Sequence, residues 1–188
     1  MTNASRPNQN SLGDISLLHA SVLLRATEAE GGDAERLKSQ FHLNDPELAA
    51  PEGRISIPRF MRLGQAAIAT TGNPALGLRM GALTRPIDTG IAGLAAETAN
   101  TVHQSLATLI RYALLSSRNS RGEPSLAAEH RKACFYSISP YNQYNYFVVD
   151  SILAAWTQLI RHMTGRYDIL ERVRIEYPSI GLDEVFES

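Results

Sequence analysis

Residues 57–81, IPRFMRLGQAAIATTGNPALGLRMG, decide the fold of the first half of the chain. Pro58 suits the first turn of a helix, where its missing N–H has no partner to lose. The apolar residues that follow recur at helical spacing, and Gly72-Asn73 provides a stop signal. Pro74 then starts a second, shorter helix. This stretch predicts two helices joined by a tight turn, with an apolar stripe on the first at Phe60, Leu63, Gly64, Ala67 and Ile68.

The same reasoning predicts helices on both sides of this stretch. Asp14 is expected to cap a helix with Ile15, Leu18, Val22 and Ala26 on one face, which ends at Gly31-Gly32. Asp33 begins another helix through Phe41, and residues 44–54, rich in proline and glycine, read as a loop. A helix of small residues is expected from Ile91 to about Ala99. Thr101 with Gln104 forms a capping-box pattern that opens an amphipathic helix bearing Val102, Leu106, Leu109, Ile110 and Ala113.

The pattern changes after Ser116. Gly122 and Pro124 suggest a hairpin, and residues 133–138 alternate as a strand that ends at Pro140. A long helix over residues 147–163 follows, and residues 172–177 alternate as a closing strand. The expected class is α+β: a helical first half packed on a small antiparallel sheet of three to four strands, with a long late helix.

Composition places the chain among ordinary globular proteins. Hydrophobic residues make up 44% and charged residues 20%, and the formal net charge is −1. A free DNA-binding domain normally carries a basic excess, so this chain is not expected to bind DNA unaided. The single cysteine, Cys134, excludes an internal disulfide. The polar N-terminus lacks the apolar core of a signal peptide, and no apolar run is long enough to span a bilayer, so we expect a cytoplasmic protein without a membrane partner. The expected organisation is a flexible polar tail (1–13), one domain (14–182) and the start of a linker (183–188).

No catalytic constellation or cofactor motif is present in the sequence. The five histidines are scattered, without the spacing of a metal site. The glycines between residues 72 and 93 lack the Gly-Lys-Ser/Thr ending of a phosphate-binding loop. We therefore expect neither an enzyme nor a bound metal or cofactor.

A small-molecule pocket is the one site that the residues suggest. Tyr136 lies on the strand face that also carries Cys134 and Ile138, and Trp156 lies in the middle of the late helix. Rings with polar edges line ligand pockets as well as cores. Arg111, followed by Tyr112, offers a fork suited to a carboxylate. The candidate ligand-binding residues are Arg111, Tyr112, Tyr136 and Trp156; the alternatives are a core role for the rings and a solvated one for the arginine.

A resemblance to a known family rests on several blocks in order. The first runs from Ile57 to Leu63, and the second is Thr71-Gly72-Asn73-Pro74 with the Gly-Leu-x-x-Gly ending at residues 77–81. Gly90-Ile91-Ala92-Gly93 and then Arg111-Tyr112 follow. Leu159-Ile160-Arg161, Thr164-Gly165 and a closing segment over residues 173–178 complete the set. Together these blocks resemble the N-terminal arabinose-binding-like domain of AraC-type transcription regulators.

That resemblance implies an effector-sensing and dimerisation domain. It implies an unidentified small-molecule effector, a homodimer, and contact with DNA only through a C-terminal helix-turn-helix domain beyond this chain. It does not imply arabinose as the effector. Two other readings remain open: a haem or gas sensor with His103 as axial ligand, and an interaction scaffold without a ligand.

Overall fold

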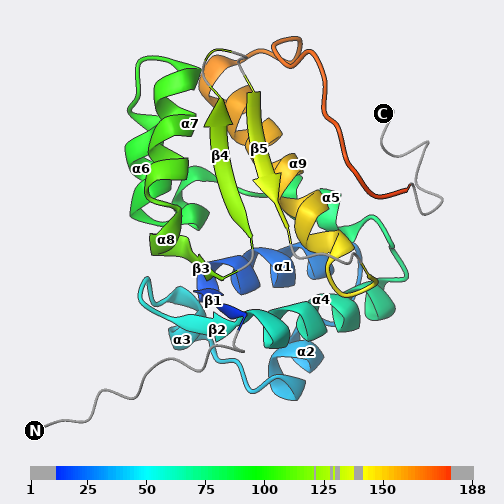
Figure 1. The fold of residues 1–188 in the computed structure, drawn as a ribbon. Helices are drawn as coiled ribbons and strands as arrows, with labels where there is room; N and C mark the ends of the chain where they lie inside the picture. Colours follow the sequence, from blue (N-terminus) through cyan, green and yellow to red (C-terminus); the bar gives the residue numbers. More distant parts are fainter. Residues whose placement is uncertain (1–11, 121, 128, 130–131, 138–141, 179–188) are drawn as a thin grey trace, which may run out of the picture.

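The first half of the chain is helical, as predicted. The structure, a computed structural model, describes residues 12–120, 122–127, 129, 132–137 and 142–178. The helices of this half are α1 (Leu17–Ala29), α2 (Ala34–Gln40), α3 (Asp45–Ala49), α4 (Ile57–Thr71), α5 (Leu76–Ala82), the 3-10 turn η1 (Pro86–Thr89), α6 (Ile91–Glu97), α7 (Val102–Arg111) and α8 (Ala113–Ser116). The late helix is α9 (Tyr146–Thr164). Figure 1 shows α1 to α4 as a lower layer, with α6 to α8 and α9 above it.

Two small antiparallel sheets accompany the helices, which confirms the α+β class. The first has the strand order β2-β1-β3, with β1 (Gly13–Ser16) between β2 (Arg54–Ser56) and β3 (Ser117–Asn119). The second is the hairpin of β4 (Glu123–Ala127) and β5 (Lys132–Tyr136). In Figure 1 the hairpin runs between α7 and α9. The first sheet thus joins both ends of the helical half, and the second spans the upper layer.

Several predicted elements differ in the structure. Asp14 does not cap a helix; it lies in β1, where its Oδ1 accepts a hydrogen bond from Arg54 Nε at 2.6 Å. Ser16 caps α1 instead, its Oγ accepting from the Leu18 N–H at 3.2 Å. The expected loop at 44–54 contains α3, capped by Asn44, and the start of β2. Strands this short form because they pair with strands that are distant in the sequence. The periodicity of a single segment does not reveal such pairing.

The closing strand predicted over residues 172–177 is wrong. Residues 171–178 form neither helix nor strand, and their alternating pattern comes with exposed side chains such as Val173. Tyr177 is the exception, since it is 7% exposed and packs its ring 4.7 Å from that of Tyr146 in α9. The segment therefore docks on a helix rather than on a sheet. Gly13, which was assigned to the expected tail, pairs in β1; residues 1–11 and the expected linker 183–188 lie outside the described residues.

Close helix packing around α9 holds the core together. A Cβ on Gly64 of α4 would lie 2.1 Å from the Phe147 ring, which also packs 5.5 Å from Phe60. On α5, a Cβ on Gly77 would come 2.5 Å from the Phe147 carbonyl oxygen, and one on Gly81 would come 2.4 Å from Ala154. Glycine is thus required at these positions because the helix backbones approach too closely for a side chain.

Candidate functional site

A cavity of about 740 Å³ lies between the helical core and the β4–β5 hairpin. Its size falls within the range of small-molecule sites. The elements that wall it come from both halves of the chain, including α1, α4, α5, α7, α8 and α9. The apolar part of the lining is Ile15, Ile57, Phe60, Met61, Met80, Ala92, Leu109, Ile110, Ala113, Leu114, Pro124, Phe135, Val148, Ile152, Ala155, Trp156 and Leu159.

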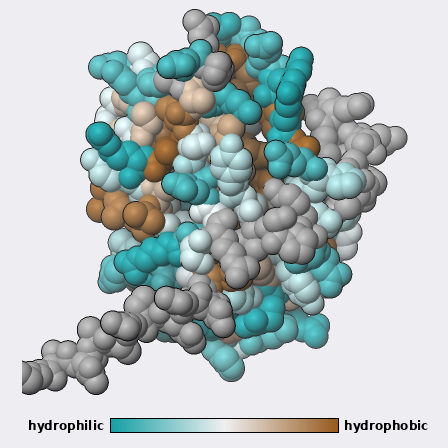
Figure 2. Space-filling model, in the orientation of Figure 1, coloured by the Kyte–Doolittle hydropathy of each residue, from teal (hydrophilic) through white to brown (hydrophobic). Residues whose placement is uncertain are grey.

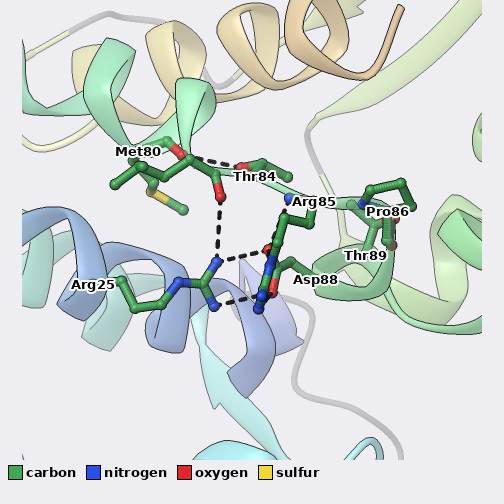
Figure 3. Close-up of polar contacts among 8 residues, drawn as sticks. Arg25, Met80, Thr84, Arg85, Pro86, Asp88 and Thr89 are labelled. Atoms are coloured by element: carbon green, nitrogen blue, oxygen red, sulfur yellow. Dashed lines mark hydrogen bonds and ion pairs between the residues drawn. The ribbon is translucent and has the colours of Figure 1, made fainter. Parts of the chain in front are cut away.

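Most hydroxyl groups on the helical wall of the cavity already donate hydrogen bonds to the backbone. Thr84 Oγ1 donates to the Met80 carbonyl at 3.1 Å, and Thr89 Oγ1 donates to that of Pro86 at 2.9 Å. Both threonines appear in Figure 3. Ser116 and Ser151 do the same within α8 and α9, at 3.1 and 2.9 Å. Because each hydroxyl has one proton, none of these four has a donor left for a ligand.

His19 of α1 also lies on this wall, and its side chain makes no hydrogen bond to the backbone of any described residue. No hydrogen bond joins its ring to another of the described residues. The pKa of His19 is lowered from 6.5 to about 4, chiefly by burial and also by the nearby Arg54, while Asp88 opposes the change. The imidazole is therefore neutral at pH 7 and offers one donor and one acceptor.

A half-buried ion pair braces α1 against η1 beside the cavity (Figure 3). Arg25 binds both oxygens of Asp88, with Nη1 at 3.0 Å and Nη2 at 2.7 Å. The Arg85 N–H also donates to Asp88 Oδ2 at 2.8 Å. Burial works to raise the pKa of Asp88, but the hydrogen bonds from Arg25 and Arg85 outweigh it and lower that pKa below its usual value. The brace holds Thr84 and Thr89 in place at the cavity wall.

Three of the four predicted site residues line this one cavity. Arg111, Tyr136 and Trp156 come from α7, β5 and α9, and the fold brings them to the same hollow. Tyr112 does not line it; this residue lies between α7 and α8 and is 46% exposed. Arg111 is exposed at the rim, whereas Trp156 is half-buried.

Tyr136, on the strand face expected to point inward, is more exposed than Phe135 on the opposite face, and both residues line the cavity. Tyr136 is 60% exposed, and its cross-strand partner Glu123 is exposed too. The neighbouring pair, Pro124 and Phe135, is half-buried and lines the cavity. Both faces of β5 carry apolar residues, so the alternation alone did not distinguish them. Tyr136 therefore reaches the lining from the edge of the hairpin, and Ile138 lies outside the described residues.

His19 lines the cavity but was not predicted as a residue of the site. Its position in α1, one residue after Leu18, gave a histidine on an amphipathic helix and no partner to place it beside. His103, the candidate haem ligand, is exposed on α7 and does not line the cavity. Within the described ranges, no three His, Cys, Asp or Glu side chains gather in a way that could hold a metal ion. In the same part of the chain, no helix is both long and apolar enough to cross a membrane.

The Thr-Gly-Asn-Pro block has a structural role in the turn between α4 and α5. Gly72 adopts a left-handed conformation, with φ of 66°, and ends α4. The Asn73 side chain accepts from the Ala75 N–H at 2.8 Å and donates to Glu30 at 2.9 Å, while Arg79 binds Glu30 at 3.0 Å. The block thus ties this turn to the end of α1, and it holds the cavity walls rather than a ligand.

A comparison with protein families supports the resemblance that these blocks indicated. Residues 31–187 match the family described as the arabinose-binding domain of AraC transcription regulators, N-terminal. No match was found among curated proteins. The matched region contains every residue that lines the cavity except Ile15 and His19. The chain belongs to the family of N-terminal arabinose-binding domains of AraC transcription regulators.

Proposed function

We propose that this chain is the effector-sensing and dimerisation domain of an AraC-type transcription regulator, and that the cavity is its effector site. The observation that carries the proposal is the cavity of about 740 Å³ inside a domain of this family. An apolar hollow with a few polar groups is the usual form of a small-molecule site. No arrangement of groups for catalysis is needed in a domain that senses a ligand.

Arg111, Tyr136 and Trp156 contact the effector in this proposal. Arg111 at the rim binds an acidic group of the ligand, and Trp156 packs against its body. Tyr112, outside the lining, acts only through the turn between α7 and α8.

A thermal-shift screen of metabolites tests the proposal, because a ligand that binds only the folded state stabilises it by RT ln(1 + [L]/Kd). Trp156 is the only tryptophan, so its emission reports on the cavity. Arg111→Ala and Tyr136→Phe are expected to weaken a hit by about 1–3 kcal/mol. The matched control is Arg62→Ala, an exposed arginine of α4 that does not line the cavity. If a hit leaves Trp156 emission unchanged and binds both cavity variants as tightly as the wild type, the effector site lies elsewhere.

An exposed apolar patch supports a second copy of the chain as partner. The patch consists of Ile87, Ile91, Leu94, Leu114 and Leu115, from η1, α6 and α8, and these side chains are 42–75% exposed. Figure 2 shows hydrophobic residues gathered on the side of the molecule where Figure 1 places α6 and α8. Regulators that read paired half-sites are two-fold symmetric, and a self-complementary patch suits such a dimer.

Leu114 links the two surfaces, since it lines the cavity and belongs to the patch. An effector that favours one position of α8 would change how two copies associate, within the limit of its differential affinity for the two states. The regulator would contact DNA in the cytoplasm through a helix-turn-helix domain that is not among these residues. With a net charge of −1, the present domain is not expected to bind short duplexes at physiological salt, and a salt-dependent mobility shift would contradict this.

A further inference from the structure

We propose that the part of the effector that enters the cavity is predominantly apolar and uncharged, and that a single hydroxyl or carbonyl oxygen on it pairs with the His19 imidazole. This inference rests on the proposed function, because it names the ligand class of the same cavity. It differs from what the family's description suggests, since a sugar carries a hydroxyl on nearly every carbon.

The hydrogen-bonding state of the wall argues against a polyhydroxylated ligand. The hydroxyls of Thr84, Thr89, Ser116 and Ser151 each donate to a carbonyl of their own helix or turn. Towards the ligand these side chains present methyl or methylene groups and a hydroxyl oxygen that can accept a hydrogen bond but not donate one. A sugar against this helical wall would find acceptors but hardly any donors, because the other polar lining residues, Ser117, Asn119, Ser120 and Ser137, lie on the side of β3 and the hairpin. Several of the sugar's oxygens would then accept no hydrogen bond from the helical wall, and each unpaired polar group weakens binding.

The charged residues of the lining stand apart from its apolar wall. Arg111 and Glu123 are both exposed, so a charged group on the ligand meets them while it is still in contact with water. The remaining titratable side chain on the helical wall, His19, is neutral and lies among residues that include Ile15 and Phe60. An acidic group of the effector therefore stays at the rim with Arg111, and the inserted part is uncharged.

His19 gives this apolar wall its specific polar contact. A neutral imidazole donates from one nitrogen and accepts at the other, so it can pair with a hydroxyl or, as donor, with a carbonyl. Since its ring has no hydrogen bond with the described residues, a ligand oxygen gains a partner there without breaking an existing bond. The discrimination expected is between ligands with and without one such oxygen on an otherwise identical apolar body.

Competition with N-phenyl-1-naphthylamine, a neutral apolar fluorophore, tests the inference. We expect the emission of the fluorophore to rise when it binds the domain. We expect 2-naphthol and naphthalene to displace it, whereas L-arabinose at millimolar concentration should not displace it. His19→Phe keeps a flat ring but removes both hydrogen-bonding nitrogens. In this variant the affinity for 2-naphthol is expected to fall by about three- to tenfold, and the affinity for naphthalene is expected to stay unchanged. His103→Phe, an exposed histidine that does not line the cavity, is the control.

A second measurement keeps the test decisive if His19→Phe does not fold. In the wild-type domain with isotope-labelled histidine, 2-naphthol is expected to shift the ring signals of His19 and to leave those of His103 in place. If His19→Phe weakens the binding of 2-naphthol and of naphthalene equally, or if 2-naphthol does not shift the ring signals of His19, the proposed contact with His19 is wrong. Displacement of the fluorophore by L-arabinose overturns the apolar class but leaves the cavity as effector site. If no compound binds the cavity or changes Trp156 emission, both this inference and the proposed function fail.

Discussion

The Tyr177 hydroxyl donates a hydrogen bond to Asp150 Oδ1 and so fastens the chain beyond α9 to the helix that forms one wall of the cavity. Asp150 is 1% exposed, and its neighbour Ser151 lines the cavity. Burial raises the pKa of Asp150 from 3.8 to about 6, and the hydrogen bond from Tyr177 opposes this without cancelling it. The segment after α9 is therefore anchored on a carboxyl group whose pKa is about 6.

Asp150 is expected to make the domain less stable as pH rises from about 4 to about 6. Over that interval the native carboxyl keeps its proton while the unfolded one has lost it, so the free energy of unfolding falls with pH. The full effect is on the order of 3 kcal/mol. Denaturant titrations at several pH values should show that Asp150→Asn removes this slope. Glu171→Gln, at an exposed carboxyl, serves as control, and an unchanged slope in Asp150→Asn would refute the assignment.

His19 is expected to contribute a slope of opposite sign. Its native pKa of about 4 lies below the usual 6.5, so between these values the unfolded chain binds a proton that the native one does not. Stability from this group is therefore complete above pH 6.5 and is lost as pH falls toward 4. In His19→Phe the free energy of unfolding should decline less between pH 6.5 and 4 than in the wild type. A steeper decline in the variant would contradict the burial of a neutral ring.

Gly81→Ala is expected to destabilise the domain by about 1–3 kcal/mol, because the new methyl group would collide with Ala154 and separate α5 from α9. Ala82→Ser, at the exposed end of the same helix, should have little effect. Thermal and denaturant unfolding measure both. Equal stability of Gly81→Ala and the wild type would mean that the two helices do not pack as closely as described.

Asp88→Asn is expected to cost about 2–4 kcal/mol, since it leaves the Arg25 guanidinium without its counter-charge beside a buried amide. The matched control is Asp168→Asn, which breaks a pair of 2.9 Å with Arg166 on the surface and should change stability little. The comparison needs only equilibrium unfolding at pH 7. Similar losses in the two variants would show that burial does not matter to the α1–η1 brace.

Ile91→Glu is expected to shift the proposed dimer to monomer, because it places a charge in the middle of an apolar contact between two copies. Ser39→Glu on α2 adds the same charge at an exposed position away from the patch. Sedimentation velocity at tens of micromolar distinguishes the species. A wild type that sediments only as a monomer would contradict the dimer itself.

The sequence predicted helices best where local signals coincide. Asp33, Thr101 and the proline after Ile57 mark the beginnings of α2, α7 and α4, because capping groups act within one turn of the residues that they bond. The α9 helix was visible because its apolar stripe is long, and Gly165 ends it with φ of 65°. Local chemistry is enough to determine such elements.

The first sheet and the geometry of the site depend on contacts that are remote in sequence. The β1 strand pairs with residues 54–56 and 117–119, and nothing within four residues of Gly13 indicates either partner. Arg111, Tyr136 and Trp156 of the predicted site line one cavity, but Phe135, on the opposite face of β5 from Tyr136, lines it too, and the prediction did not include His19. Which ring nitrogen or hydroxyl remains unbonded becomes apparent only when all neighbours are in place.

The hairpin wall gives the cavity a kinetic property. Among the described residues, β4 and β5 pair with each other and with no third strand, and a lone two-stranded hairpin has little stability of its own. Phe135 and Pro124 would gain apolar contacts from a bound ligand, and these contacts would stabilise the paired strands of the hairpin. Amide hydrogens of the hairpin should therefore exchange quickly in the empty domain and slowly in the occupied one. The residence time of the effector would then be governed by how often this pair of strands opens.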